Sequence, residues 1–215
     1  MVEIITVHNL DNPNVTLPYD RDDFYNEQVE TYKKTGAPTK SIEVVNLLLF
    51  NTDKQIILQK RSRNKNHNPS LLDKSVGGHI KFEDSPHYTL MVETVQELMV
   101  PSIVLYDDQD FDKSYGLLRD YLQNVAIVKK ITTDDMVVTK IFRSENIKIA
   151  NKIHLFFGIF NGATRPADKE ASGILFYNLD DLNLEIKEKP EIFTNDLITL
   201  LSKYKKEIDE FVKKI

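Results

Sequence analysis

The chain has 215 residues, 28 basic and 33 acidic side chains, a formal net charge of −5 and no cysteine. This length allows one domain with a substantial core, and the mildly acidic balance argues against duplex nucleic acid as a partner, which usually requires a basic surplus. The lack of cysteine excludes disulfides, cysteine-based zinc sites and a cysteine nucleophile. No stretch approaches the roughly 18 apolar residues of a membrane span, and the first residues lack a secretory pattern, so we expect a cytoplasmic protein without a membrane partner.

The N-terminal segment predicts a strand, a turn and a helix. Residues 3–7 predict a short strand, and the Asn, Asp and Pro residues at positions 9–14 are typical of turns. Residues 22–34 predict a helix, which the sequence Gly36-Ala37-Pro38 ends.

A strand pair and the best helix candidate follow. The apolar segments 43–50 and 55–59 flank a short polar segment, which predicts a β-hairpin. A polar loop then leads to a Gly77-Gly78 pair, which we expect to form a loop before the helix at residues 86–100. Ser85 can cap this helix, and a proline suits its first position.

The predicted helix carries an apolar and a polar face. Residues at helical spacing form an apolar stripe that we expect to face the core: Tyr88, Met91, Val92, Val95, Leu98 and Met99. Glu93, Gln96 and Glu97 share another face, because residues three and four apart are neighbours on a helix. We expect that polar face to point away from the core.

The second half of the chain mixes strands and helices without a regular βαβ rhythm. The predicted strands span residues 102–106, 124–132, 152–161 and 173–177, and the predicted helices span residues 111–122 and 194–214. Residues 134–150 predict no clear element. We therefore expect an α+β or α/β fold, with a mixed sheet sandwiched between helices and one domain spanning residues 1–215.

The polar helix face is a candidate metal site. Two carboxylates and an amide oxygen at this spacing can share Mg²⁺, which prefers oxygen ligands, and the carbonyls of the glycine pair could complete the shell. A cation there would polarise a phosphorus atom for attack by water. The spacing alone leaves an alternative open, because such a face is common on solvated helices and a glycine pair can be only a turn.

The order of residues 77–100, GGHIKFEDSPHYTLMVETVQELMV, resembles the Nudix box. That pattern is Gly, five residues, Glu, seven residues, then Arg-Glu-U-x-Glu-Glu-x-Gly-U, where U is aliphatic. The positions that match without a gap are Gly78, Glu93, Glu97 and Val100. The positions that depart from the pattern are Asp84, Val92, Thr94, Gln96 and Met99.

The residues before the box resemble the Nudix subgroup that is similar to isopentenyl-diphosphate isomerase. The matching positions are Gln59, Arg61, Ser62, Lys65, Pro69 and Ser75 to His79, and the resemblance returns at PEIFT, residues 190–194. It becomes thin between about residues 107 and 150. The isomerases need a cysteine where Gly77 stands, so the resemblance implies the hydrolase branch, which cleaves a nucleoside diphosphate linked to another moiety.

The resemblance implies a Nudix fold with residues 1–40 as an N-terminal extension and residues 77–100 as the box loop and helix. It implies catalytic and metal-binding roles for Glu93 and Glu97, with Gly78 and Gln96 as further ligands of Mg²⁺ or Mn²⁺. Glu170 falls where many members carry an acid near the site and is a further catalytic candidate. Family members often pair, which is consistent with a homodimer.

Arg61, Lys65 and His79 are candidate substrate-binding residues. The two basic side chains could contact phosphates, and the histidine could be a ligand or a phosphate donor. The alternatives are that the basic residues lie in a solvated loop and that the histidine is structural.

Two functions follow from these features: a Mg²⁺-dependent hydrolase of a nucleotide or diphosphate compound, or a non-catalytic module that binds such a ligand. Two departures from the pattern argue against the hydrolase. Val92 replaces the Arg that orients the neighbouring glutamates, and Gln96 replaces a Glu and so removes one negative charge from the metal ligands.

Overall fold

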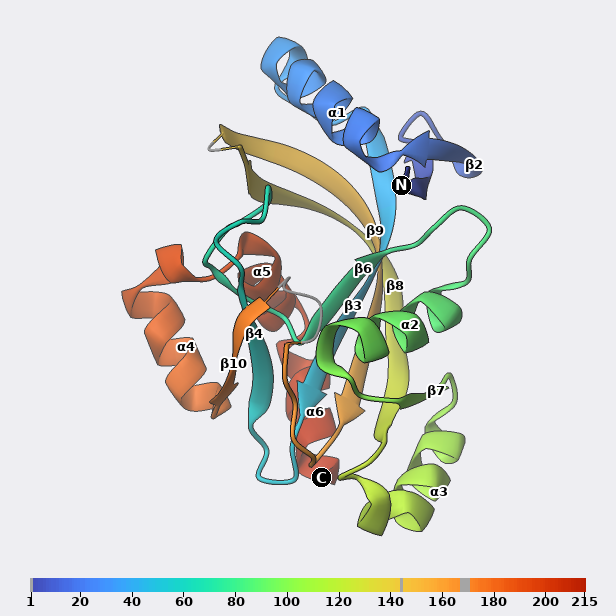
Figure 1. Ribbon diagram of the computed structural model, residues 1–215, viewed down its shortest axis with the longest axis vertical. Helices are drawn as coiled ribbons and strands as arrows, with labels where there is room; N and C mark the ends of the chain where they lie inside the picture. The colour runs from blue at the N-terminus through green and yellow to red at the C-terminus, as the bar shows by residue number, and fades with distance from the viewer. Residues whose placement is uncertain (1, 144, 167–170) are drawn as a thin grey trace.

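The computed structural model describes residues 2–143, 145–166 and 171–215 (Figure 1). The strands are β1 (Ile4–Asn9), β2 (Asn12–Asp20), β3 (Lys40–Phe50), β4 (Ile56–Arg61), β5 (Leu72–Asp73), β6 (Val76–His79), β7 (Ser102–Leu105), β8 (Ala126–Phe142), β9 (Glu145–Ile159) and β10 (Ala171–Tyr177). The helices are α1 (Arg21–Thr35), α2 (Pro86–Leu98), α3 (Asp108–Leu118), α4 (Leu179–Glu188), α5 (Asn195–Lys203) and α6 (Lys205–Lys214), with 3-10 turns at Arg119–Tyr121 and Pro190–Ile192.

The strands form one mixed sheet. Its main path runs β10-β4-β3-β9-β8-β7, while β1, β5 and β6 attach to the edges of β3 and β4, and β2 pairs with β1. The central pair β3 and β9 is parallel, with Val45 opposite His154, and β8 runs antiparallel to β9. The predicted mixed sheet is confirmed.

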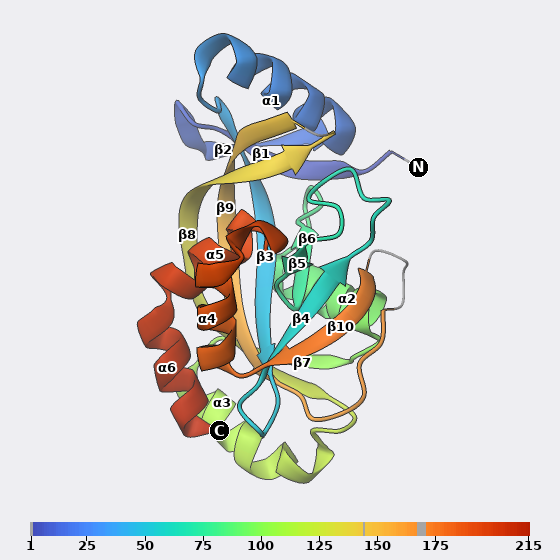
Figure 2. The same cartoon turned by 90° about the vertical axis from the view of Figure 1, so that its left-hand side faces the viewer.

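Helices cover both faces of this sheet. Leu47 and Leu49 of β3 pack in one cluster with Leu90 and Leu98 of α2. Leu48, between them, joins the opposite cluster with α5 and α6, since successive strand side chains point to opposite faces. Figure 2 shows α4, α5 and α6 on the side of the sheet away from α2. The predicted sandwich of a sheet between helices is therefore confirmed.

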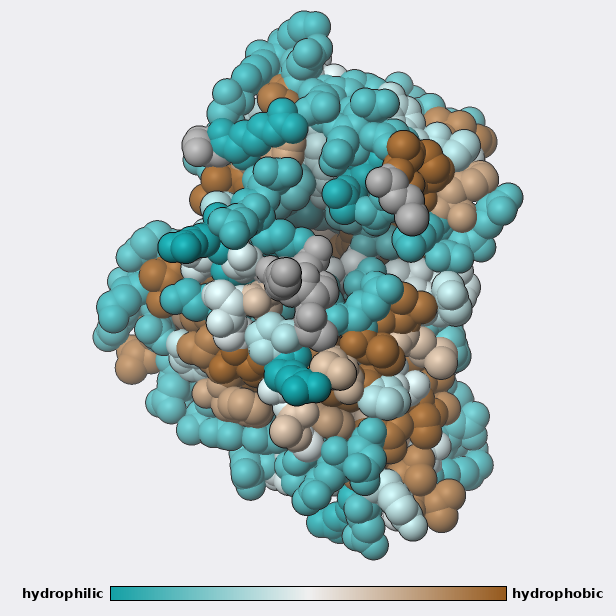
Figure 3. All heavy atoms as spheres, in the orientation of Figure 1, coloured by the Kyte–Doolittle hydropathy of each residue, from teal (hydrophilic) through white to brown (hydrophobic). Residues whose placement is uncertain are grey.

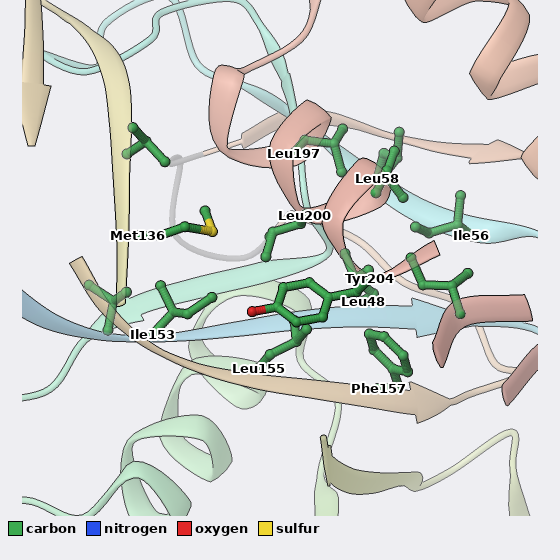
Figure 4. Close-up of a cluster of buried hydrophobic side chains, with 14 of the residues drawn as sticks. Leu48, Ile56, Leu58, Met136, Ile153, Leu155, Phe157, Leu197, Leu200 and Tyr204 are labelled. Atoms are coloured by element: carbon green, nitrogen blue, oxygen red, sulfur yellow. The ribbon is translucent and has the colours of Figure 1, made fainter. Parts of the chain in front are cut away.

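The larger core cluster joins the sheet to the C-terminal helices. Figure 4 shows side chains of the strands and of the C-terminal helical segment packed together: Leu48, Leu155, Phe157, Leu197, Leu200 and Tyr204. Each fully buried side chain of this kind contributes roughly 1.5–3 kcal/mol. The helical segment consists of two helices rather than the one predicted. They separate at Tyr204, whose hydroxyl donates a hydrogen bond to Asp134 Oδ2 at 2.6 Å.

Two regions differ from the predicted elements. Strand β2 begins inside the segment predicted as turns, residues 9–14, and extends to Asp20. Among the described residues it pairs with β1 alone, and as an edge strand it tolerates Pro13 and Pro18. Residues 134–150 predicted no element, but residues 134–142 belong to β8 and residues 145–150 belong to β9, and these strands form a long hairpin in which Val137 pairs with Ala150. In Figure 1 this hairpin curves over the molecule toward α1. Helix α4 was also not predicted.

In the part of the chain that the structure describes, every helix is too short or too polar to cross a membrane.

Candidate functional site

Helix α2 begins at Pro86 as its sequence predicts, but it ends at Leu98, two residues before the predicted end. Ser85 Oγ accepts a hydrogen bond from the Tyr88 amide at 3.1 Å, and Pro86 occupies the first turn. The C-cap is Met99, which adopts the left-handed conformation with φ 58°. Met99 thus takes the backbone conformation that the Nudix pattern assigns to glycine, at the energetic cost that this conformation has for a residue with a Cβ atom.

The buried face of α2 is not the predicted apolar stripe. Tyr88, Met91, Val95 and Met99 are all at least 40% exposed, and Val92 is half-buried. The face that packs against the sheet contains Thr89, Leu90, Thr94, Glu97 and Leu98. Thr94 contributes a buried hydrogen bond between its Oγ1 and Ser102 Oγ at 2.9 Å. Figure 3 shows hydrophobic side chains along the side of the molecule that carries α2 and β7.

The rotation of α2 turns Glu97 inward, so the prediction that the polar face points away from the core is wrong for this residue, whereas Gln96 is exposed and Glu93 is half-buried. Glu97 is only 6% exposed, and its Oε2 accepts a hydrogen bond from Gln59 Nε2 at 2.7 Å. The same nitrogen donates to the Ser75 carbonyl at 2.6 Å. Strand β4 thus holds the carboxylate of Glu97 in place through an amide that is itself anchored to the backbone before β6.

The glycine pair lies in strand β6 rather than in a loop, as Gly77 and Gly78 pair with Asn46 and Val45 of β3. A Cβ atom on Gly78 would stand 2.5 Å from Cγ and Cδ of Glu93. A Cβ atom on Gly77 would stand 2.5 Å from Cε of Lys74. Real Cβ contacts are not this short. Only glycine at both positions lets an acid and a base approach the strand so closely.

The predicted site residues that the structure describes all line one cavity of about 790 Å³: Arg61, Lys65, Gly78, His79, Glu93, Gln96 and Glu97. Glu170 lies outside the described residues. A narrow cavity of about 20 Å³ continues between Gln59, Asp73, Lys74 and Glu97. That space suffices for about one water molecule with several polar partners.

A buried charged cluster at this cavity was not predicted from the sequence. Asp73 Oδ2 accepts a hydrogen bond from Arg61 Nη1 at 3.0 Å, and Oδ1 accepts from Thr194 Oγ1 at 2.8 Å and from Lys74 Nζ at 3.2 Å. Burial raises the pKa of the Asp73 carboxyl, but Lys74 and Arg61 outweigh burial and hold the pKa well below its usual range. The indication in the sequence is a charged pair, Asp73-Lys74, inside the apolar segment 71–76.

Two further residues of the cluster come from distant elements. Lys140 of β8 and Asp196 of α5 also line the cavity. Asp196 Oδ2 lies 3.7 Å from the Nζ atoms of both Lys74 and Lys140. No local pattern could have indicated this arrangement, because it depends on how the β8–β9 hairpin meets α5.

His79 lines the cavity as an uncharged ring. Burial lowers the pKa of His79 well below its usual value. Its Nε2 lies 3.0 Å from the hydroxyl of Tyr25 on α1. A neutral imidazole exchanges a hydrogen bond with a ligand but brings no positive charge to a phosphate.

The donors on the α2 side of the cavity suit a hard divalent cation in type, because they are carboxylate, amide and carbonyl oxygens. Their number is small: within residues 2–143, 145–166 and 171–215, no three His, Asp or Glu side chains converge as a metal site. Glu93 beside Gly78, and Glu97 one helical turn later, therefore provide two carboxylates.

Comparisons with known proteins concern mainly the fold. No family model matches the sequence. A segment of 107 residues is 32% identical to triplex capsid protein 2 of Alcelaphine herpesvirus 1 (strain C500), covering 49% of this chain and 33% of that protein. The chain thus spans about a third of the length of the curated relative it matches.

The structure is similar to DR0079 from Deinococcus radiodurans, with a TM-score of 0.62 and 16% identity, covering 94% of this chain and 98% of that chain. It is also similar to a bifunctional NMN adenylyltransferase/ADP ribose pyrophosphatase from Francisella tularensis, complexed with AMP and a Mn ion. That likeness has a TM-score of 0.51 and 12% identity, and covers 87% of this chain and 47% of that chain. A NUDIX-family hydrolase from Clostridium perfringens has a TM-score of 0.47 and 16% identity, covering 79% and 97%. The chain has a mixed α+β fold, with a curled mixed sheet between helices, and shares it with DR0079 and with part of the Francisella tularensis enzyme.

Proposed function

We propose that the chain is a hydrolase that uses a divalent cation and water to cleave a diphosphate bond in a nucleoside diphosphate derivative or a similar compound. The observation that carries this proposal is the placement of Glu93 and Glu97, one helical turn apart, at one cavity with Gly78 and a group of basic side chains. Carboxylates and cations that face one space suit a ligand that carries both phosphate and a bound metal ion.

In this proposal Glu93, Glu97, Gln96 and the Gly78 carbonyl hold Mg²⁺ or Mn²⁺. The cation would polarise the phosphoryl group and stabilise its developing charge. Gln59 positions Glu97 through the 2.7 Å hydrogen bond. Gln96 in place of a third carboxylate lowers the affinity for the cation, since affinity follows the ligand charge. Glu170 remains a candidate for a further catalytic acid or base.

The substrate contacts in this proposal come from Arg61, Lys65 and His79. The Arg61 guanidinium is held by Asp73 and donates from Nε to the His67 carbonyl at 3.0 Å, so its position is fixed before a ligand arrives. The neutral ring of His79 would hydrogen-bond a phosphate or sugar oxygen. Four further statements about the chain stay predictions. They are membership of the isomerase-like subgroup, a single domain over residues 1–215, a cytoplasmic location and a homodimer.

A non-catalytic module that binds a nucleotide or diphosphate is the second candidate. It is favoured by the small set of acidic ligands in the described part of the chain and by the hydrogen bond from Gln59 that engages one oxygen of Glu97. Such a module would keep the cavity and its basic side chains but would not turn over its ligand.

A turnover screen separates the two candidates. Nucleotides and diphosphate compounds are incubated with Mg²⁺ or Mn²⁺. The phosphate monoesters and inorganic phosphate that hydrolysis yields are separated and quantified by chromatography for the wild type, for Glu97→Gln and for Glu30→Gln, which changes an exposed acid on α1. The hydrolase predicts turnover that Glu97→Gln lowers about 100-fold and Glu30→Gln leaves unchanged. Binding without turnover supports the module. If no compound binds or reacts, both candidates are wrong.

A further inference from the structure

Lys74 and Lys140 present two buried ammonium groups that share one distant carboxylate, while Lys74 Nζ also donates a hydrogen bond to Asp73 Oδ1 at 3.2 Å. Their side chains are 8% and 12% exposed, and both Nζ atoms lie 3.7 Å from the same oxygen of Asp196. A charge-assisted hydrogen bond is shorter, at roughly 2.7–2.9 Å. The other oxygen of Asp196 is buried without a hydrogen-bond partner among the described residues. Asp196 therefore engages neither ammonium group closely, and Lys74 uses one of its three N–H donors on Asp73.

The cluster keeps Lys140 charged. Burial lowers the pKa of its ammonium, but Tyr25 and Asp196 outweigh burial, and the pKa is raised above its usual value. Along this wall of the cavity the cations Arg61, Lys74 and Lys140 outnumber the acids Asp73 and Asp196. A buried surplus of positive charge with free N–H donors favours an anionic ligand.

The backbone around Lys140 is fixed on both sides. The Thr139 amide donates to Asn195 Oδ1 at 3.1 Å, which ties β8 to α5. The Ile141 amide donates to Asn68 Oδ1 at 2.8 Å, which ties it to the loop after β4. Lys140 thus stands between two anchored residues. A charge held in place before binding loses little conformational entropy when a ligand arrives.

We propose that Lys74 and Lys140 form a subsite for a terminal phosphate of the ligand. This inference rests on the proposed function and narrows it to diphosphates that end in a free phosphate, rather than diphosphates esterified at both ends. A terminal phosphate carries a charge of about −1.5 to −2 at pH 7 and three strong acceptor oxygens. A phosphorus esterified on both sides carries one negative charge. The cavity of about 790 Å³ accommodates a ligand that contacts this subsite and Glu93 together.

Binding of ADP and ADP-ribose tests the subsite without turnover. Both carry the same nucleoside, but only ADP ends in a free phosphate. Affinities are measured by calorimetry in EDTA, where a metal-dependent hydrolase is inactive and the ammonium groups are intact. We expect ADP to bind about tenfold more tightly than ADP-ribose, and Lys140→Met to abolish this preference by weakening ADP alone.

The matched control is Lys148→Met, which removes an exposed lysine from the neighbouring strand β9. It should leave both affinities within about twofold, because an exposed charge is screened by solvent. Lys140→Gln replaces the methionine variant if thermal unfolding shows that the latter does not fold. Equal affinities in the wild type, or an equal loss for both ligands on changing Lys140, would overturn the inference.

The binding test and the turnover screen distinguish failure of the subsite from failure of the hydrolase proposal. A Lys140-dependent preference for ADP in EDTA, without turnover of any compound in Mg²⁺, would support the subsite and reject the hydrolase. Turnover of diphosphates without that preference would support the hydrolase and reject the subsite.

Discussion

The two walls of the cavity are built in different ways. The carboxylate wall comes from one helix and the strand before it, with Glu93 and Glu97 on adjacent turns of α2 and Gly78 beside them. The basic wall is assembled from β4, the segment before β6, β8 and α5, and its members Lys140 and Asp196 meet only in the folded chain. Substitutions in the carboxylate wall should change the free energy of unfolding little, because its residues come from neighbouring segments. Substitutions in the basic wall should change both ligand binding and the free energy of unfolding, because its residues join distant elements.

The largest expected effect tests this coupling at Asp73. Asp73→Asn keeps the shape of the side chain but leaves Arg61 and Lys74 without their carboxylate. Breaking a buried ion pair by removing one partner costs about 3–5 kcal/mol, so we expect a loss of that size in the free energy of unfolding. Urea unfolding measures it. The control Asp53→Asn, in the exposed β3–β4 turn, should stay within about 0.5 kcal/mol. Equal losses for both variants would show that the basic wall does not stabilise the fold.

A partly buried carboxylate outside the cavity, that of Glu43, gives an expected effect of similar size. Glu43 accepts hydrogen bonds from His154 at 2.6 Å and from His8 at 3.1 Å. Burial raises its pKa, but these histidines outweigh burial and lower it to about 2. A depressed pKa contributes stability that is fully present above the unfolded value of about 4.5 and is lost as the pH falls toward about 2.

We therefore expect the free energy of unfolding of the wild type to exceed that of Glu43→Gln by on the order of 3 kcal/mol at neutral pH. The difference should shrink as the pH falls from about 4.5 to about 2. Urea unfolding across this range measures it. A difference that stays constant with pH would mean that the two histidines do not stabilise an ionised Glu43.

A substitution in the carboxylate wall should change the affinity for a divalent cation rather than the free energy of unfolding. The Cβ atom of Gly78→Ala would displace the Glu93 side chain, whose flexible end can move at little cost to the fold. If the chain binds a divalent cation here, we expect about a tenfold loss of Mn²⁺ affinity, measured by calorimetry. Gly116→Ala is the control, since a Cβ atom on that helical glycine meets nothing within 4 Å. An unchanged Mn²⁺ affinity in Gly78→Ala would place the cation elsewhere.

The smallest expected effect concerns the end of α2. Met99→Gly removes the strain of a left-handed residue, with φ 58°, but also its contact with Arg165 Nε at 3.1 Å. We expect the free energy of unfolding to rise by about 0.5–1 kcal/mol. Met99→Ala keeps the strain and should show no gain. Equal melting temperatures for the two variants would contradict this explanation of the C-cap.

Local patterns predicted those elements whose boundaries depend on neighbouring residues. The start of α2 follows from Ser85 and Pro86, and the hairpin of β3 and β4 follows from two apolar runs around a short polar turn. The predicted site residues described by the structure meet at one cavity, because the spacing within the box and its approach is itself local. Strand β2 was missed because the Asn, Asp and Pro residues at positions 9–14 are typical of turns, although a proline is also tolerated in an edge strand.

The orientation of α2 could not be predicted, because its sequence carries two apolar faces. Met91 and Val95 are as apolar as Leu90 and Leu98, yet only the latter pair is buried. Docking against β6 and β7 decides between these faces. The same docking brings Glu97 within hydrogen-bonding distance of Gln59. The wrong prediction of the buried helix face and the wrong prediction of the direction of Glu97 therefore have one cause.

By itself the sequence determined the helix that carries Glu93 and Glu97, since capping and residue spacing are local properties. Only the tertiary structure decided that α2 places Glu93 against Gly78 and buries Glu97, and that Lys140 and Asp196 join Lys74 at the same cavity. The physical reason is that burial and electrostatic pairing depend on which surfaces meet, and those surfaces come from segments far apart in the chain.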